Sequence, residues 1–194
     1  MSGYETPFQK YLLTGGIILV LIIASFANYM RDTIALERAE KEAFKRFKKV
    51  EKPTTDIYIP QMKIAGPNGE LVDLLDGEYY TVLNIWATWC SPCVKELTAL
   101  KGLKKILSYE RKWRVIAVSI DSSKDIEKLS KMVKKLKVKD FAGYYDINKN
   151  LQRAVNVKGI PMTLLLNKRG KVLYIVYGDA FWFDDSIVRL LRFI

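Results

Sequence analysis

The only two cysteines of the 194-residue chain, Cys90 and Cys93, are separated by two residues. A disulfide that only stabilises a fold more often joins distant segments, because the stabilisation grows with the length of the closed loop. A closely spaced pair can instead act as a small redox loop, in which one thiolate attacks a disulfide and the second cysteine resolves the product. The spacing therefore favours thiol–disulfide chemistry, with two incidental buried thiols as the alternative.

The residues around the pair predict a strand before it and a helix after it. Residues 80–87 are rich in β-formers, and residues 92–108 place apolar side chains on one helical face. A cysteine at a helix N-terminus meets unpaired N–H groups and the positive end of the helix dipole, and both stabilise a thiolate. We therefore expect Cys90 to be the nucleophile and Cys93 to be the resolving cysteine. Pro92 suits the first turn, where its missing N–H removes no hydrogen bond.

The chain contains no histidine. Ser–His and Cys–His catalysis are therefore impossible within it, and the commonest metal ligand is missing. A zinc site built on the two cysteines would need a second pair of Cys or His residues, which the sequence lacks. We accordingly expect no metal and no other cofactor.

The formal net charge is +11, carried largely by lysines spread along the chain. Charge distributed in this way is usually a solvated surface, and the functional alternative is attraction to anionic lipid or to an acidic partner. No known nucleic-acid-reading motif accompanies the charge, so nucleic acid is not an expected partner.

Residues 1–30 are predicted to be an uncleaved membrane anchor. The stretch Tyr11–Met30 contains no charged residue, and twenty helical residues span about 30 Å, the thickness of the hydrocarbon core of a bilayer. A cleaved signal peptide is the alternative, because Ser25 and Ala27 are small residues at a plausible cleavage spacing.

The charges that flank the span conflict with export. Lys10 is the one basic residue before it, whereas several follow it closely, namely Arg31, Arg38, Lys41, Lys45 and Arg46. The positive-inside rule alone would place the large domain in the cytoplasm, although long domains can translocate despite such flanks.

Residues 31–56 are predicted to form a charged helical stalk or linker. Apolar residues recur at steps of three and four, which predicts a helix from Arg31 to Lys52 that Pro53 ends. The stripe consists of Leu36, Ala39, Ala43, Phe47 and Val50. Such a helix can lie on its own domain or on the membrane surface; a dimerising helix is the alternative, but two heptads are few for a coiled coil.

Residues 57–194 are predicted to be one α/β domain. Strand and helix patterns alternate along it, and two final strands flank a turn at residues 167–170. The further predicted elements are strands at 115–120, 162–166 and 172–177 and helices at 126–136 and 186–193. Strands separated by helices and followed by a hairpin predict a sandwich with a mixed central sheet.

Three motifs of this domain resemble those of the thioredoxin superfamily. Trp86–Cys93 resembles its active-site motif, Gly159–Thr163 its cis-proline loop, and Lys168–Lys171 the charged turn that follows. They match in order and spacing, and the resemblance implies a thioredoxin-like fold in which a cis proline faces the disulfide. The substrate-binding residues that it implies are Trp89, Pro92, Ile160 and Pro161. Trp89, like Trp182, is interpreted first as a packing residue, but its place beside the nucleophile makes it the better candidate for a substrate contact.

Within the superfamily the chain is similar to the membrane-anchored TlpA/ResA-like branch. The N-terminal span, the extra length between Asp121 and Pro161, and the spacing of Glu96 from the cysteines carry this similarity. Thioredoxin has a buried aspartate where this chain has Asn84, so Glu96 is the candidate to deprotonate Cys93. The alternative for Glu96 is an exposed residue that only favours the helix dipole. Thr98 replaces a proline that is common in this branch.

The resemblance implies an anchored, extracytoplasmic dithiol that reduces disulfides of exported proteins. Apocytochrome c and the copper-site cysteines of oxidase assembly factors are the implied partner classes, with a membrane thiol reductant as the electron source. A thiol peroxidase is the rival enzyme, but residues 85–90 lack the proline that it needs. A copper-carrying assembly protein needs three residues between its cysteines and a distant histidine, and a non-catalytic module would most naturally have lost one cysteine.

Overall fold

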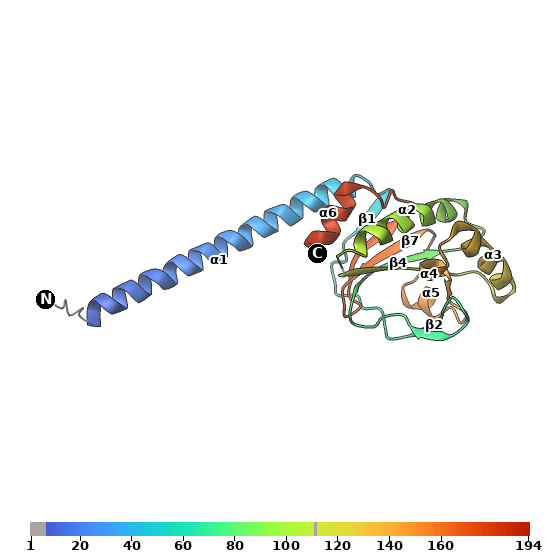
Figure 1. The fold of residues 1–194 in the computed structure, drawn as a ribbon, viewed down its shortest axis with the longest axis horizontal. Coiled ribbons are helices and arrows are strands. Elements are labelled where there is room, and N and C mark those ends of the chain that lie inside the picture. The colour runs from blue at the N-terminus through green and yellow to red at the C-terminus, as the bar shows by residue number, and fades with distance from the viewer. Residues whose placement is uncertain (1–6, 111) are drawn as a thin grey trace.

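The computed structural model describes residues 7–110 and 112–194, as one long helix leading into an α/β domain (Figure 1). Residues 1–6 of the predicted anchor lie outside the described residues. The long helix is α1 (Pro7–Phe44). The other helices are α2 (Ser91–Leu107), a 3₁₀ turn (Ser123–Asp125), α3 (Ile126–Leu136), α4 (Lys139–Ala142), α5 (Asn150–Ala154) and α6 (Asp185–Phe193).

The strands form one mixed sheet in the order β1-β8-β7-β4-β5-β6-β2-β3. β4, β5 and β6 are parallel, whereas β7 and β8 run antiparallel to their neighbours. Their bounds are β1 (Lys49–Glu51), β2 (Lys63–Ala65), β3 (Leu71–Asp73), β4 (Tyr80–Trp86), β5 (Trp113–Ser119), β6 (Tyr144–Tyr145), β7 (Met162–Leu166) and β8 (Val172–Tyr177). The predicted α/β sandwich with a mixed sheet is confirmed.

The central strand β4 separates two apolar cores. Because side chains alternate along a strand, Val82 and Trp86 pack into the core under α2 and α6, and Leu83 and Ile85 pack into the core on the opposite face. All four side chains are buried. Asn84 lies between Val82 and Trp86 in the alternation, so the sequence places an amide on the face of the sheet that α2 covers.

The helix predicted from Arg31 to Lys52 ends earlier than expected. α1 ends at Phe44, and Lys49–Glu51 form strand β1, which pairs antiparallel with β8. The prediction was wrong for these last residues because β8 offers an unpaired edge whose backbone groups bond β1. Phe47 in the turn and Val50 in the strand still face the core.

The C-terminal part of α1 packs against the domain. Ala39 and Ala43 are buried, and α1 contacts α6. Glu40 accepts a hydrogen bond from the Tyr174 hydroxyl and pairs with Lys52 at 2.8 Å. The side chains of residues 15–31 are exposed instead. The helix is long and apolar enough over Gly15–Phe44 to cross a membrane, a criterion that signal sequences also meet.

Candidate active site

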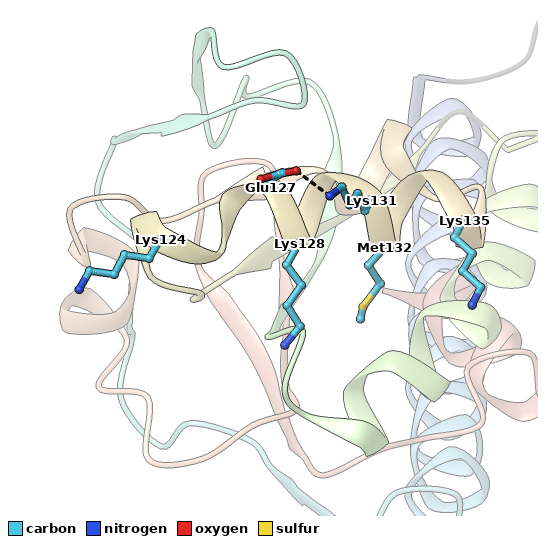
Figure 2. A pocket seen from close by; sticks show the side chains of 6 residues that line it. All are labelled: Lys124, Glu127, Lys128, Lys131, Met132 and Lys135. Atoms are coloured by element: carbon cyan, nitrogen blue, oxygen red, sulfur yellow. Dashed lines mark ion pairs between the residues drawn. The ribbon is translucent and has the colours of Figure 1, made fainter.

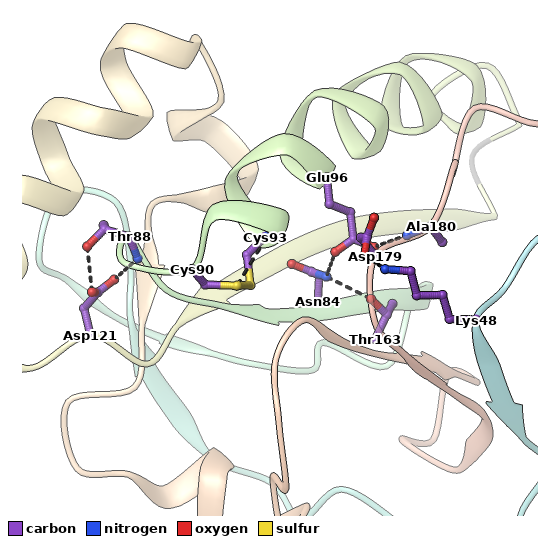
Figure 3. Close-up of a disulfide and its surroundings, with 10 residues drawn as sticks. All are labelled: Lys48, Asn84, Thr88, Cys90, Cys93, Glu96, Asp121, Thr163, Asp179 and Ala180. Atoms are coloured by element: carbon purple, nitrogen blue, oxygen red, sulfur yellow. Dashed lines mark hydrogen bonds and ion pairs between the residues drawn. A yellow bond between two sulfur atoms is a disulfide. The ribbon is translucent and has the colours of Figure 1, made fainter.

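The two cysteines form a disulfide at the N-terminus of α2 (Figure 3). Cys90 is the N-cap residue, and its sulfur accepts a hydrogen bond from the Cys93 backbone N–H at 3.3 Å. A thiolate at this position is stabilised by the same N–H group and by the helix dipole. Cys90 retains 6% exposure, whereas Cys93 retains none. Both cysteines are therefore buried, and Cys90 is the one of the pair that keeps some exposure.

We predict that the reduced protein is alkylated first on Cys90. A thiolate on Cys90 is stabilised by the N-terminus of α2. Cys90 also keeps 6% exposure whereas Cys93 has none, and a fully buried thiol resists ionisation. A limiting amount of iodoacetamide followed by peptide mass spectrometry will locate the adduct, with the denatured protein as the control in which both cysteines react. Preferential labelling of Cys93 would contradict the assignment.

Residues of the predicted cis-proline loop lie at the same end of the sheet. The Ile160–Pro161 peptide bond is cis. Met162, the next residue, pairs with Ile85 in β4 and with Tyr177 in β8. Because β4 leads directly into the segment that carries Cys90, this register brings the loop to the edge of the sheet that holds the disulfide.

The predicted contact residues differ in exposure. Trp89 is 63% exposed, so its interpretation as a packing residue was wrong. Pro92 is also exposed, Ile160 is half-buried and Pro161 is buried. Trp89 and Pro92 thus offer an apolar surface next to Cys90.

Glu96 is buried in a pocket of hydrogen-bond donors. It is 3% exposed, so the interpretation of Glu96 as an exposed helix residue was wrong. Its Oε1 accepts hydrogen bonds from the Trp182 indole at 2.6 Å and the Ala180 backbone at 3.0 Å, and its Oε2 accepts one from Asn84 Nδ2 at 3.0 Å. These partners come from β4 and from the loop after β8.

Burial raises the pKa of Glu96 to about 7, although the three hydrogen bonds lower it and the nearby charge of Asp179 adds to the increase. Desolvation penalises the charged carboxylate, and the donors offset only part of that penalty. A carboxyl group with a pKa near neutrality can both accept and release a proton at working pH.

Sequence reasoning missed the role of Trp182 as a donor to Glu96, because it was interpreted only as a packing residue. Trp182 is fully buried, and a buried indole N–H usually finds an acceptor. That rule was the available signal, but which carboxylate would accept the bond depends on the fold. Ala180 and Thr163, which also border this network, carried no such signal.

Asp121 fixes the segment that leads to Cys90. Its carboxylate accepts hydrogen bonds from the backbone and hydroxyl of Thr88, both at 2.8 Å, and from the Ser119 hydroxyl at 2.5 Å. Asp121 follows β5, whose parallel partner β4 ends two residues before Thr88. This contact ties the turn to the sheet and sets the position of the nucleophile.

The lysine-rich helix α3 borders a shallow hollow away from this chemistry (Figure 2). It is lined by Lys124, Glu127, Lys128, Lys131, Met132 and Lys135. Lys131 pairs with Glu127 at 2.6 Å, and both side chains are highly exposed. The hollow holds no redox group, and its lysines fit the solvated surface that the charge distribution predicts.

The fold and the site together define a thiol–disulfide oxidoreductase of the thioredoxin class. Residues 77–172 match the thioredoxin-like family. The thioredoxin-like protein YneN of Bacillus subtilis is 32% identical over 127 residues, which cover 61% of this chain and 69% of that protein. The chain belongs to the thioredoxin-like family.

Two further comparisons agree with this assignment. The thiol-disulfide oxidoreductase ResA of Bacillus subtilis is 30% identical over 120 residues, which cover 61% of this chain and 65% of that protein. The crystal structure of a DsbF homologue from Corynebacterium diphtheriae superimposes with a TM-score of 0.61, at 20% identity, over 76% of this chain and 94% of that chain. The structural likeness shows the fold alone.

Proposed function

We propose that the chain is a membrane-anchored reductant of disulfides in extracytoplasmic partner proteins. The observation that carries this proposal is the Cys90–Cys93 disulfide at a helix N-terminus, in which Cys90 keeps the small exposure of the pair and directly follows the exposed Trp89. Residues 1–30 serve as the anchor, residues 31–56 as the segment that connects it to the domain and supplies the edge strand β1, and residues 57–194 as the rest of the catalytic domain.

The reaction begins with the reduced pair. The Cys90 thiolate attacks one sulfur of the partner's disulfide, and the other partner sulfur leaves as a thiolate that takes up a proton. Cys93 then loses its proton to Glu96 and attacks the Cys90 sulfur. The partner's second sulfur leaves, the Cys90–Cys93 disulfide forms, and two electrons have moved to the partner.

Four residues are proposed to hold the partner's chain. Trp89 and Pro92 flank Cys90 at the surface, and Ile160 and Pro161 form the facing loop. Apocytochrome c and the copper-site cysteines of oxidase assembly factors are the partner classes that we propose, in keeping with the similarity to ResA. A membrane thiol reductant returns electrons to the pair.

Trapping in cells tests the proposal. Replacing Cys93 by alanine removes the resolving thiol, so the mixed disulfide on Cys90 accumulates. We expect adducts with exported cysteine-containing proteins, recovered by affinity purification without reductant and released by dithiothreitol. Cys90→Ala is the matched control and should trap none of them. An adduct set made up only of cytoplasmic proteins, or no adduct at all, would contradict the proposal.

We also predict that the mature chain retains the apolar helix and stays with membranes. Burial in the hydrocarbon of a bilayer stabilises the apolar side chains of residues 17–23, which are exposed in the structure. Salt weakens attraction between charges but does not weaken this burial. Washing membranes with high salt or carbonate should leave the protein in the pellet, while detergent should release it. A mature N-terminus at Asn28 in a soluble fraction would show a cleaved signal peptide instead.

A further inference from the structure

The side-chain amide of Asn84 is completely buried, and only one end of it is hydrogen-bonded. Its Nδ2 donates to Glu96 Oε2 at 3.0 Å and to Thr163 Oγ1 at 2.8 Å. Among the residues that the structure describes, Oδ1 meets no donor. A buried carbonyl oxygen without a donor is unfavourable and uncommon in folded proteins, so this atom needs an explanation.

The unpaired oxygen faces the disulfide. In Figure 3 Asn84 lies between the Cys90–Cys93 bond and Glu96, with its oxygen directed toward the sulfur atoms and its nitrogen toward Glu96 and Thr163. Cys93 and Glu96 are three residues apart on α2 and therefore share the face that covers β4. A disulfide has no hydrogen to donate, whereas reduction gives Cys93 one S–H group.

We propose that Asn84 is a positioning residue whose amide binds Cys93 in both of its reduced forms. This inference rests on the proposed function, in which Cys93 ionises during turnover. While Cys93 is a thiol, its S–H donates to Asn84 Oδ1, and Nδ2 continues to donate to the Glu96 carboxylate. The oxygen that is unpaired in the oxidised protein thereby gains a donor as soon as the disulfide is reduced.

Ionisation of Cys93 reverses the amide. One proton leaves Cys93 Sγ, one proton arrives on the Glu96 carboxylate, and no electron moves in this step. The amide of Asn84 then turns about its Cβ–Cγ bond, so that Oδ1 accepts from the Glu96 carboxyl and Nδ2 donates to the thiolate. An ionised aspartate at this position has no N–H to offer the thiolate, so asparagine is required for the second orientation.

The other charged groups around this network have partners of their own or are exposed, so we assign the contact with Cys93 to Asn84. Asp179, in the loop after β8, faces Glu96 and pairs with Lys48 at 2.5 Å. Asp121, on the other side of Cys90, has its carboxylate bonded to Thr88 and Ser119. Lys95 on α2 is exposed. Burial of Glu96 raises its pKa to about 7, which lets it take up the proton near neutrality.

The S–H stretching band of Cys93 tests the first contact directly. The full-length chain carrying Cys90→Ala, reduced in detergent, has Cys93 as its one thiol, and this band falls in a region of the infrared spectrum free of other protein bands. We expect a band lowered by hydrogen bonding, which moves up to the position of a free thiol when Asn84→Leu is added. Asn84→Ala provides a second variant should the leucine protein fail to fold.

Thr163→Val is the matched control. It removes the other acceptor of Nδ2 without touching Oδ1, so the S–H band should stay where it is in the Cys90→Ala protein. A band that is identical with and without the Asn84 amide would overturn the proposal.

The ionisation of Cys93 tests the second contact. The ultraviolet absorbance of the thiolate, followed against pH in the same proteins, gives the pKa of the Cys93 thiol. Loss of a donor to the thiolate should leave about tenfold less thiolate at a given pH in the Asn84 variants, since hydrogen bonds to charged groups are the stronger ones. An unchanged pKa would overturn the amide reversal. Both measurements need no partner and no turnover, so they stand apart from any failure of the trapping experiment.

Discussion

Replacing Glu96 by glutamine will slow the reduction of a disulfide by about tenfold or more near neutral pH, which is the usual size of a general-base effect. The resolving thiol must ionise after the mixed disulfide forms, and Cys93 is fully buried, where a thiol resists ionisation. Glu96 follows Cys93 by three residues on the buried face of α2, and glutamine keeps its shape but cannot take the proton.

The pH profile gives the sharper test of this prediction. Because the pKa of Glu96 is raised to about 7 by burial, the carboxylate that serves as the base becomes available as pH rises through that value. The parent rate should therefore rise across neutrality, and the Glu96→Gln rate should lack that rise. Stopped-flow fluorescence with a peptide disulfide will follow both rates.

Glu127→Gln is the matched control, because Glu127 is an exposed glutamate on α3 and should leave the rate unchanged. Alkylation of Cys90 should also be preserved in Glu96→Gln. If Glu96→Gln reduces the peptide at the parent rate at every pH, solvent rather than Glu96 accepts the proton.

Replacing Phe47 by alanine will lower the free energy of unfolding by about 3 kcal/mol, a typical loss for a buried phenylalanine. Phe47 is 8% exposed, and its ring lies 5.4 Å from the ring of Trp182 between centroids. Removal of the ring leaves a cavity in the core next to the donor that holds Glu96. Denaturant titration of the detergent-solubilised protein measures the loss.

The same change should raise the pKa of Glu96, because a less firmly held Trp182 indole stabilises the carboxylate less well. Carbon NMR of the glutamate carboxyl groups will report that shift. Leu71→Ala is the control, since Leu71 is 64% exposed and its truncation removes little buried area. Equal stability of the Phe47→Ala and Leu71→Ala proteins would show that the turn after α1 contributes little to the domain.

The central elements of the fold were predictable because their patterns are local. β7 and β8 begin and end where the sequence places them, and α2 starts at the residue after Cys90. The short strands β2, β3 and β6 were missed because two or three residues carry no measurable period, and their pairing is decided by neighbours distant in the chain. Strand β1 was predicted as part of a helix for the same reason.

In the candidate site, too, the local motifs were predictable and the long-range contacts were not. The cysteines and the cis proline belong to motifs that are read from consecutive residues. The role of Glu96 was predicted from its spacing to the cysteines, but its donors Trp182 and Ala180 could not be, because they follow it by 86 and 84 residues. Whether a glutamate on a helix faces water or a buried indole depends on which loop packs beside it.

The uninterrupted helix α1 has a geometric consequence. From Ile17 to Phe44 it contains neither glycine nor proline, and its last turns pack against α6 (Figure 1). With a rise of about 1.5 Å per residue, the segment from Met30 to Ala39, where packing against the domain begins, is roughly 14 Å long and restricts the movement of the domain relative to the anchor. In the membrane-anchored protein that we propose, the helix therefore holds the disulfide within a narrow range of distances from the membrane surface. We expect it to react only with partner cysteines that lie at a similar distance from the membrane, so that it encounters its substrates by diffusion in the plane of the membrane.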